Sequence, residues 1–291
     1  MNNKKILLKK SNVGHFYVKN IPTKKKLSEY YEKKYFKVNP RYSTKTKKFE
    51  EIYYDYQSRI RLEFILSKFK NKKKKTLLDV GAGTGRFLYY TKNFIKNSVG
   101  VDFGVDQLKY KLQKKIKLIK ENPVNFLKNN NINFDIITLN NIVEHSDNVD
   151  ELFDVLKKKV KKSTLILVCI PNDFSELQKH LMKNKLVKSR YWISYPDHLH
   201  YFDSKNFIEF ITKKKFKLID AISDYPIETL LLDNNFNYTD PKLKIGKSAH
   251  YFRCKFTNFI YENSKSKDVI NYFRSCFELG IGRNNLFIIK K

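Results

Sequence analysis

The 291-residue sequence has only three cysteines, which could form disulfide bonds, and only nine glycines and seven prolines, which interrupt helices and strands. The cysteines, Cys169, Cys254 and Cys276, are far apart and form no paired motif. This spacing argues against a disulfide framework and against a zinc ribbon. Reduced thiols fit a cytosolic protein, so we expect a cytoplasmic location.

The sequence also lacks any uninterrupted apolar run long enough to cross a bilayer. The first residues, "MNNKKILLKKSN", have an apolar centre that is too short for a signal peptide. Hydrophobic residues nevertheless make up 41% of the chain, which is enough for a substantial core. We therefore expect a soluble protein without a membrane span.

Acidic side chains are scarce, since 29 Asp and Glu stand against 59 Lys and Arg, for a net charge of +30. A dense basic surface attracts nucleic acid, acidic membranes or anionic substrates. However, the lysines are spread along the whole chain together with many asparagines and isoleucines, a bias typical of AT-rich coding sequences. A nucleic-acid partner is therefore an alternative that we do not favour, and the sequence does not indicate an oligomeric state.

The middle of the chain alternates short apolar runs with longer helical stretches, which predicts an α/β fold with a doubly wound parallel sheet. The predicted strands are 76–80, 98–102, 116–120, 134–140, 163–171, 216–222 and 284–291. The predicted helices between them are 85–95, 105–115, 148–160, 175–183 and 204–215. The spacing of Leu152, Phe153, Leu156 and Val160 gives the third of these helices an apolar face.

We divide the chain into four parts on this basis. Residues 1–70 form an N-terminal helical cap or extension, with helices predicted at 26–36 and 49–69. Residues 71–226 form the core. Residues 227–282 are too long for a hairpin loop and too patterned for a linker, so we expect a partly helical insertion that covers a pocket. Residues 283–291 supply the last core strand.

Three of the nine glycines, Gly81, Gly83 and Gly85, follow the first predicted core strand in "TLLDVGAGTGRF". A glycine-rich turn between a buried strand and a helix lets the backbone approach a ligand. The dinucleotide fingerprint G-x-G-x-x-G requires another glycine at the position of Arg86, and a phosphate-binding P-loop requires a G-K-[ST] ending. Neither pattern is present, so a nicotinamide oxidoreductase is disfavoured.

Together with Asp79, these glycines resemble motif I of the class I S-adenosylmethionine (SAM)-dependent methyltransferases, an apolar strand followed by D-x-G-x-G-x-G. The resemblance implies a Rossmann-like, seven-stranded, mostly parallel sheet with an antiparallel last strand. It also implies SAM as cofactor, S-adenosylhomocysteine (SAH) as product, and the following cofactor-binding residues: Asp79, Gly81, Ala82, Gly83, Thr84, Gly85, Asp102, Phe103, Asn122, Asn140 and Asn141.

The resemblance assigns roles to several of these residues. Asp102 ends the second strand, where an acidic side chain accepts hydrogen bonds from both ribose hydroxyls, and Phe103 follows where the adenine packs. Asn140 and Asn141 lie beside the methionine moiety. The family often carries an acidic residue near the adenine amino group, and here only Asn122 is available for that place.

The candidate catalytic residues are His145, His198 and His200. They follow the fourth and fifth core strands, whose carboxyl ends border one crevice in a doubly wound sheet. Methyl transfer to a hydroxyl benefits from a general base, and histidine is suited to that role. An alternative is that these histidines only hold the loop by hydrogen bonds.

A metal site is another alternative at this place. The segment "NNIVEH" with a later histidine resembles the E-x-x-E-H arrangement of ubiquinone-pathway O-methyltransferases and small-RNA 2′-O-methyltransferases, which hold a divalent ion. Here Asn141 replaces the first glutamate, which leaves Glu144, His145 and either His198 or His200. Because a hard cation prefers more carboxylate ligands, we do not expect a divalent metal.

Aromatic residues and the N-terminal segment bear on the acceptor. Tyr191, Trp192 and Tyr195 form a candidate apolar wall against the substrate, although core packing is the commoner use of such side chains. The segment "GHFYVKNIPTKKKLSEYYEKKYF" resembles one found before the methyltransferase domain of bacterial proteins that modify sugars and cell-surface polysaccharides. The resemblance favours O-methylation of a small-molecule or sugar-linked acceptor. An RNA 2′-O-methyltransferase and a non-catalytic SAM-binding partner subunit are the alternatives.

Overall fold

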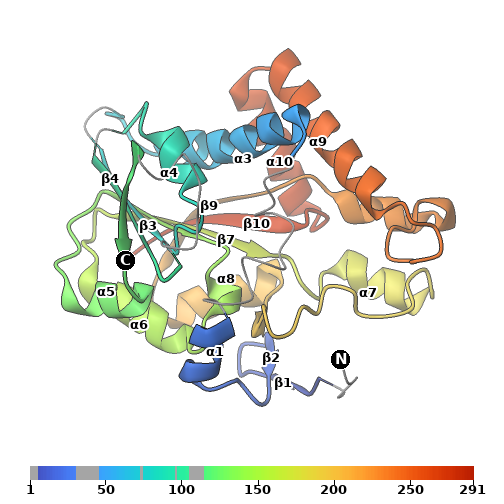
Figure 1. Ribbon diagram of the computed structural model, residues 1–291, viewed down its shortest axis with the longest axis horizontal. Helices are drawn as coiled ribbons and strands as arrows, with labels where there is room; N and C mark the ends of the chain where they lie inside the picture. The colour runs from blue at the N-terminus through green and yellow to red at the C-terminus, as the bar shows by residue number, and fades with distance from the viewer. Residues whose placement is uncertain (1–5, 31–45, 73–74, 96, 105–114) are drawn as a thin grey trace.

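The computed structural model describes residues 6–30, 46–72, 75–95, 97–104 and 115–291, and its main element is a seven-stranded sheet (Figure 1). The strand order is β5-β4-β3-β6-β7-β10-β9. The strands are β3 (Thr76–Val80), β4 (Asn97–Asp102), β5 (Lys117–Lys120), β6 (Ile136–Asn140), β7 (Leu165–Pro171), β9 (Lys217–Ser223) and β10 (Asn284–Lys290). β10 runs antiparallel to β7 and β9, whereas the other paired strands are parallel. The predicted fold class is confirmed.

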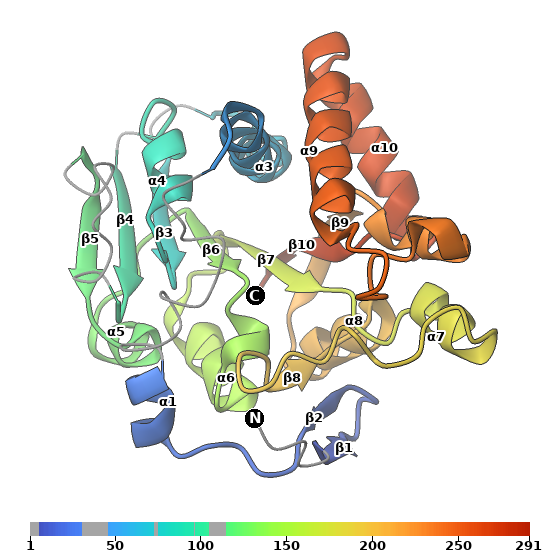
Figure 2. The same cartoon turned by 45° about the vertical axis from the view of Figure 1, so that its right-hand side comes forward.

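Helices cover both faces of this sheet (Figure 2). The helices on one face are α3 (Lys48–Leu66), α4 (Arg86–Thr91), α9 (Gly246–Asn263) and α10 (Ser266–Glu278). The helices on the other face are α5 (Pro123–Asn129), α6 (Val149–Lys159) and α8 (Ser204–Lys213). In the part of the chain that the structure describes, no helix combines the length and the apolar character needed to cross a membrane.

Local sequence explains where the elements of the core begin and end. Every residue of β7 is buried, as expected for a central strand covered on both faces. The apolar stripe of α6 buries Leu152, Phe153 and Leu156 against the sheet, and the Asn148 side chain caps its N-terminus by accepting from the N–H of Glu151. The amphipathic pattern of this helix therefore places its polar face in solvent.

Several helices lie in the segment before the last strand. This segment contains the 3₁₀ turns η6 (Ile227–Leu232) and η7 (Asn234–Phe236), followed by α9 and α10. The helix α9 packs along α3 of the N-terminal part, and an aromatic stack of Tyr56 on Tyr261 joins the two helices at 4.5 Å between ring centroids. The helix α3 and the insertion helices α9 and α10 thus lie together on one face of the sheet, whereas residues 6–30 lie on the other side (Figure 2).

A second, three-stranded sheet was not predicted from the sequence. It contains β1 (Leu8–Lys10), β2 (Phe16–Val18) and β8 (His200–Tyr201), so the N-terminal part is not entirely helical. The short helix α1 (Lys24–Tyr30) covers only the beginning of the predicted helix 26–36. The rest of that helix and residues 105–114 of another predicted helix lie outside the described residues. The remaining helix, α7 (Glu176–Lys183), lies where the sequence predicts one.

Two buried histidines meet beside this small sheet. Nε2 of His15 lies 3.3 Å from Nδ1 of His200, and the His15 ring stacks on Phe202 at 4.1 Å between centroids. Burial lowers the pKa of His15 to about 3 and that of His200 to about 4. The proximity of His200 lowers the pKa of His15 further. Both rings are therefore neutral at physiological pH.

These lowered pKa values predict a fold that weakens in mild acid. In the unfolded chain His200 becomes protonated below about pH 6.5, whereas in the native protein it becomes protonated only below about pH 4. The free energy of unfolding therefore decreases as the pH falls from about 6.5 to about 4. For His200 alone the loss between pH 7.5 and pH 4.5 should be about 2.5 kcal/mol. Urea unfolding at both pH values measures it. A His200→Gln variant should be less stable at pH 7.5 yet lose about 2.5 kcal/mol less on acidification than the wild type; equal losses would contradict the assignment.

Candidate active site

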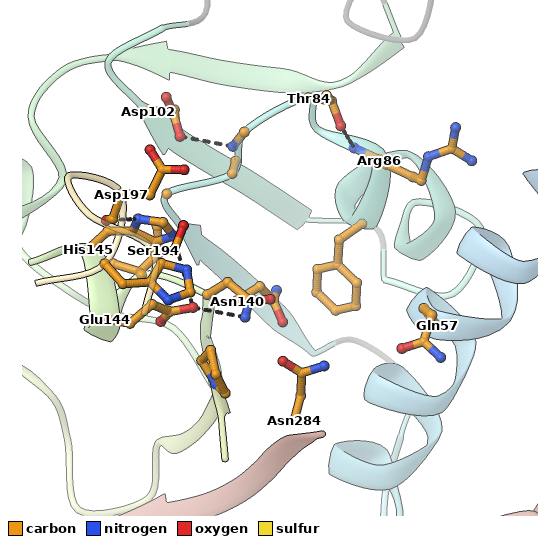
Figure 3. A pocket seen from close by; sticks show the side chains of 18 of the residues that line it. Gln57, Thr84, Arg86, Asp102, Asn140, Glu144, His145, Ser194, Asp197 and Asn284 are labelled. Atoms are coloured by element: carbon orange, nitrogen blue, oxygen red, sulfur yellow. Dashed lines mark hydrogen bonds and ion pairs between the residues drawn. The ribbon is translucent and has the colours of Figure 1, made fainter. Parts of the chain in front are cut away.

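A pocket of about 1570 Å³ opens at the carboxyl ends of β3, β4, β6 and β7. Its lining comes from the glycine loop after β3, from α3, from the loop 191–198, from α9 and from the start of β10. In Figure 3, Glu144, His145, Ser194 and Asp197 gather at one side, while Gln57 and Asn284 reach the pocket from α3 and β10. The pocket therefore joins the predicted cofactor loop to the predicted catalytic loops.

The glycine loop needs glycine at two positions for reasons of space and of backbone conformation. Gly81 and Gly85 both have φ of 73°, a left-handed conformation that favours glycine. A Cβ on Gly81 would lie 1.9 Å from Ile142, and a Cβ on Gly85 would lie 2.2 Å from Ile116. Gly85 does not line the pocket, so its contribution is to let the loop turn and pack against the next strand.

Asp102, the last residue of β4, binds the glycine loop through its carboxylate. Its Oδ2 accepts a hydrogen bond from the N–H of Gly83 and its Oδ1 accepts one from the N–H of Gly104, both at 2.9 Å. Burial raises the pKa of Asp102, and these backbone donors oppose the rise. Each carboxylate oxygen keeps a second lone pair for a ligand in the pocket that Asp102 lines.

Asp79 lies at the other end of the loop and is almost fully buried. It accepts hydrogen bonds from Oγ1 of Thr138 at 2.6 Å and from Nδ2 of Asn140 at 3.0 Å. Burial raises its pKa to about 6, while these two donors and the nearby charge of Arg61 lower it. Asp79 and Arg61 are not in contact, but they place one negative and one positive charge in the same pocket, which fits the ammonium and carboxylate ends of an amino acid.

Arg61 was not predicted from the sequence as a site residue, because nothing in the spacing of α3 places it near Asp79. Its Nη2 lies 3.8 Å from Sγ of Cys169, and its Nε is buried without a hydrogen-bond partner. Within the described ranges, no carboxylate lies within 4 Å of this guanidinium to neutralise it. Arg61 is partly buried, and a partly buried cation without a counter-ion favours an anionic ligand.

Arg86, which separates the motif from a dinucleotide fingerprint, anchors α3 to the loop. It forms ion pairs with Glu51 and, at 3.4 Å, with Asp55, and its guanidinium lies over the ring of Tyr54 at 5.3 Å. These contacts hold α3, and with it Arg61, at a fixed place beside the glycine loop.

The asparagines and Phe103 lie in the pocket lining, but two of them also have structural roles. Asn122 caps α5 by accepting from the N–H of Asn125 at 2.9 Å. Asn141 adopts a left-handed conformation with φ of 56° and donates from Nδ2 to Oε1 of Glu144 at 2.9 Å. Asn141 therefore orients the glutamate that follows it.

Comparison with known proteins decides the family of this chain. The model of the methyltransferase-domain family matches residues 50–220, which is more than half of the sequence. The chain belongs to the methyltransferase-domain family. The predicted recognition of a class I SAM-dependent methyltransferase is confirmed.

Individual relatives are distant from this methyltransferase. It is 30% identical over 112 residues to an uncharacterized protein of Methanocaldococcus jannaschii, a match that covers 38% of this chain and 48% of the relative, so the chain spans about half of that relative's length. A SAM-dependent methyltransferase structure from Archaeoglobus fulgidus matches with a TM-score of 0.52 and 21% identity, covering 84% of this chain and 98% of that one, which shows the shared fold. The cyclopropane synthase MmaA2 of Mycobacterium tuberculosis matches with a TM-score of 0.48 and 16% identity, covering 86% of this chain and all of that one.

In another part of the pocket, Glu144, His145 and His198 come together. One ligand atom from each lies within 4.8 Å of the others, and the rings of the two histidines meet at 4.9 Å between centroids. Nδ1 of His145 lies 2.6 Å from the backbone oxygen of Asp197. Because a carbonyl oxygen only accepts, Nδ1 carries a proton, and Nε2 is the other ring nitrogen, 3.9 Å from Oε1 of Glu144.

Some predicted residues of the methyltransferase site lie elsewhere. His200 does not line the pocket, because β8 directs its ring toward His15, and we withdraw it as a catalytic candidate and as a metal ligand. The trio that the structure brings together contains His198 in its place. Tyr195 is 45% exposed and is also absent from the lining, whereas Tyr191 and Trp192 line the pocket. Trp192 packs on Phe174 at the same time.

Proposed function

We propose that this methyltransferase transfers the methyl group of SAM to a hydroxyl of a small-molecule or sugar-linked acceptor. One observation carries the proposal: the pocket that begins at the glycine loop continues to His145, whose Nδ1 is committed to the Asp197 carbonyl. Nε2 is then oriented to take the proton of a hydroxyl as the methyl group moves to its oxygen. Glu144, whose Oε1 lies 3.9 Å from Nε2, stabilises the charged ring that forms.

We place SAM along the glycine loop. Asp102 accepts hydrogen bonds from the ribose hydroxyls, and Phe103 packs on the adenine. Asp79 accepts from the ammonium group, and Arg61 donates to the carboxylate, which supplies the anion that this guanidinium lacks. This placement directs the sulfonium toward Asn140 and Asn141, which line the same pocket as His145.

The raised pKa of Asp79 predicts that cofactor affinity depends on pH. Above about pH 6 the carboxylate is ionised and pairs with the ammonium group, and below it the ligand must first displace a proton. The Kd of SAH should therefore rise about tenfold for each pH unit below about pH 6. Calorimetric titration with SAH at pH 7.5, 6 and 5 checks this. An Asp79→Asn variant should bind weakly at each pH without this slope.

Activity is tested with SAM carrying a labelled methyl group and panels of neutral, carboxylated and phosphorylated sugars. We expect label in at least one panel and stoichiometric SAH. Retention of the label in SAM with every acceptor, in protein that binds SAH, would reject the saccharide acceptor. Tighter binding of NAD than of SAH would reject the proposal altogether.

A further inference from the structure

The side of the pocket formed by the insertion carries a second guanidinium without a counter-ion. Arg253 on α9 lines the pocket, and its Nε is buried with no hydrogen-bond partner. Among the residues that the structure describes, no carboxylate oxygen lies within 4 Å of it. Arg283, in contrast, also lines the pocket but is neutralised by Asp173 at 2.9 Å and by Glu228 at 3.4 Å.

A hydrogen-bond relay fixes the orientation of Arg253. Its Nη2 donates to Nδ1 of His250 at 2.8 Å, since a guanidinium can only donate. His250 then carries its proton on Nε2, which lies 3.2 Å from Oε1 of Glu50 on α3. The guanidinium also lies over the ring of Tyr53 at 5.5 Å. Arg253 is thus held in one place by neighbours that leave its charge unpaired.

Asp224, a carboxylate on the pocket wall whose charge acts on Arg253, already accepts hydrogen bonds from another residue. Asp224 accepts from the backbone N–H of Asn284 at 2.8 Å and from its Nδ2 at 2.5 Å. The negative charge of Asp224 raises the pKa of Arg253, but the two side chains do not form an ion pair. Arg253 is partly buried, and a partly buried cation without a counter-ion is stabilised when a ligand supplies the anion.

Arg61 and Arg253 have different contacts in the pocket. Arg61 contacts Sγ of Cys169 and lies close enough to Asp79 to act on its pKa, which ties Arg61 to the cofactor end. Arg253 instead bonds to His250 on the insertion, although Asp224 and Tyr53 act on both guanidinium groups. SAM has one carboxylate, and one guanidinium satisfies it. The second guanidinium then remains for the acceptor.

We propose that Arg253 binds an anionic oxygen group, a carboxylate or a phosphate, carried by the methyl acceptor. This inference rests on the proposed function for the identity of the acceptor site. The acceptor would thus be an acid, such as a uronic acid or a sugar phosphate, whose anion is held at α9 while its hydroxyl is presented to the methyl group. Bidentate recognition by the planar guanidinium suits both anions.

The side-chain Nε–Hε signal of Arg253 provides a direct test by ¹⁵N NMR, with assignment from its absence in an Arg253→Lys variant. Acetate, acetamide and inorganic phosphate are titrated into the SAH-saturated protein. Acetate or phosphate should shift the signal saturably, with an affinity at least about tenfold higher than that of acetamide. A comparison of the affinities of Arg253 for acetate and for phosphate shows which of the two anionic groups it prefers. A signal that does not move, or that moves equally with acetamide, overturns the proposal.

Two variants complete the test. Lys255→Gln removes a charge from an exposed position of the same helix and should leave the anion response unchanged. Arg253→Gln lacks the observed signal and is used only for cofactor binding, where the Kd of SAH should stay within about threefold of the wild type. A large loss of SAH affinity would instead assign Arg253 to the cofactor and overturn the proposal. If the wild type does not bind SAH, the proposed function fails separately, and the same anion titration without SAH still reports on Arg253.

Discussion

Replacing Asp102 by asparagine should weaken SAH binding by about 100-fold or more. In the proposed complex this carboxylate accepts from both ribose hydroxyls, and hydrogen bonds to a charged acceptor contribute about 1.5–3 kcal/mol each. The substitution also turns one oxygen into an N–H donor that faces the backbone N–H of Gly83 or Gly104. The cofactor contact and the shape of the loop would then be lost together.

The two losses can be separated experimentally. Calorimetry with SAH gives the binding loss, and thermal unfolding without ligand gives the cost to the loop, which should be a decrease of a few degrees. Asp268→Asn is the matched control, because Asp268 is an exposed residue in the first turn of α10 and does not line the pocket. A Kd for SAH within about threefold of the wild type in Asp102→Asn would show that the ribose lies elsewhere.

The core sheet could be predicted from sequence because local signals agree with the tertiary structure there. β3 has the predicted bounds, since four of its five residues are buried and the glycine loop ends it abruptly. β7 and β10 are recognisable for the same reason, as apolar runs covered on both faces. The helix α5 was missed although Asn122 and Pro123 form a readable start signal, an N-cap followed by proline.

Long-range pairing explains what the sequence could not predict. The small sheet depends on two residues of β8 pairing with β2 across most of the chain, and such short strands carry no periodicity. That pairing turns His200 away from the pocket, although it lies two residues from His198, which lines it. Arg61, Arg253 and the carbonyl of Asp197 come from segments without a motif, and only the packing of α3 and α9 at the sheet brings both guanidinium groups to the pocket.

Replacing His145 by alanine should lower kcat by about 10²–10⁴-fold while the Kd of SAH stays within about threefold of the wild type. The Asp197 carbonyl keeps the proton of His145 on Nδ1. In the proposed mechanism, Nε2 therefore accepts the proton of the acceptor hydroxyl, and alanine cannot do so. His180→Ala is the matched control, since His180 lies on the exposed side of α7 and should leave kcat unchanged. A His145→Ala enzyme with wild-type kcat would contradict a role for this ring in proton transfer.

The same trio also resembles an incomplete metal site, so the loss of activity in His145→Ala needs a second measurement to assign it. If His145 acts as a base, wild-type activity should survive extensive treatment with EDTA, and Glu144→Gln should reduce kcat without creating a metal requirement, because Glu144 then acts only on the charged ring. If a metal acts, chelation should abolish activity and a divalent cation should restore it in the wild type but not in His145→Ala or His198→Ala. Because the trio contains a single carboxylate, we expect the chelated enzyme to remain active.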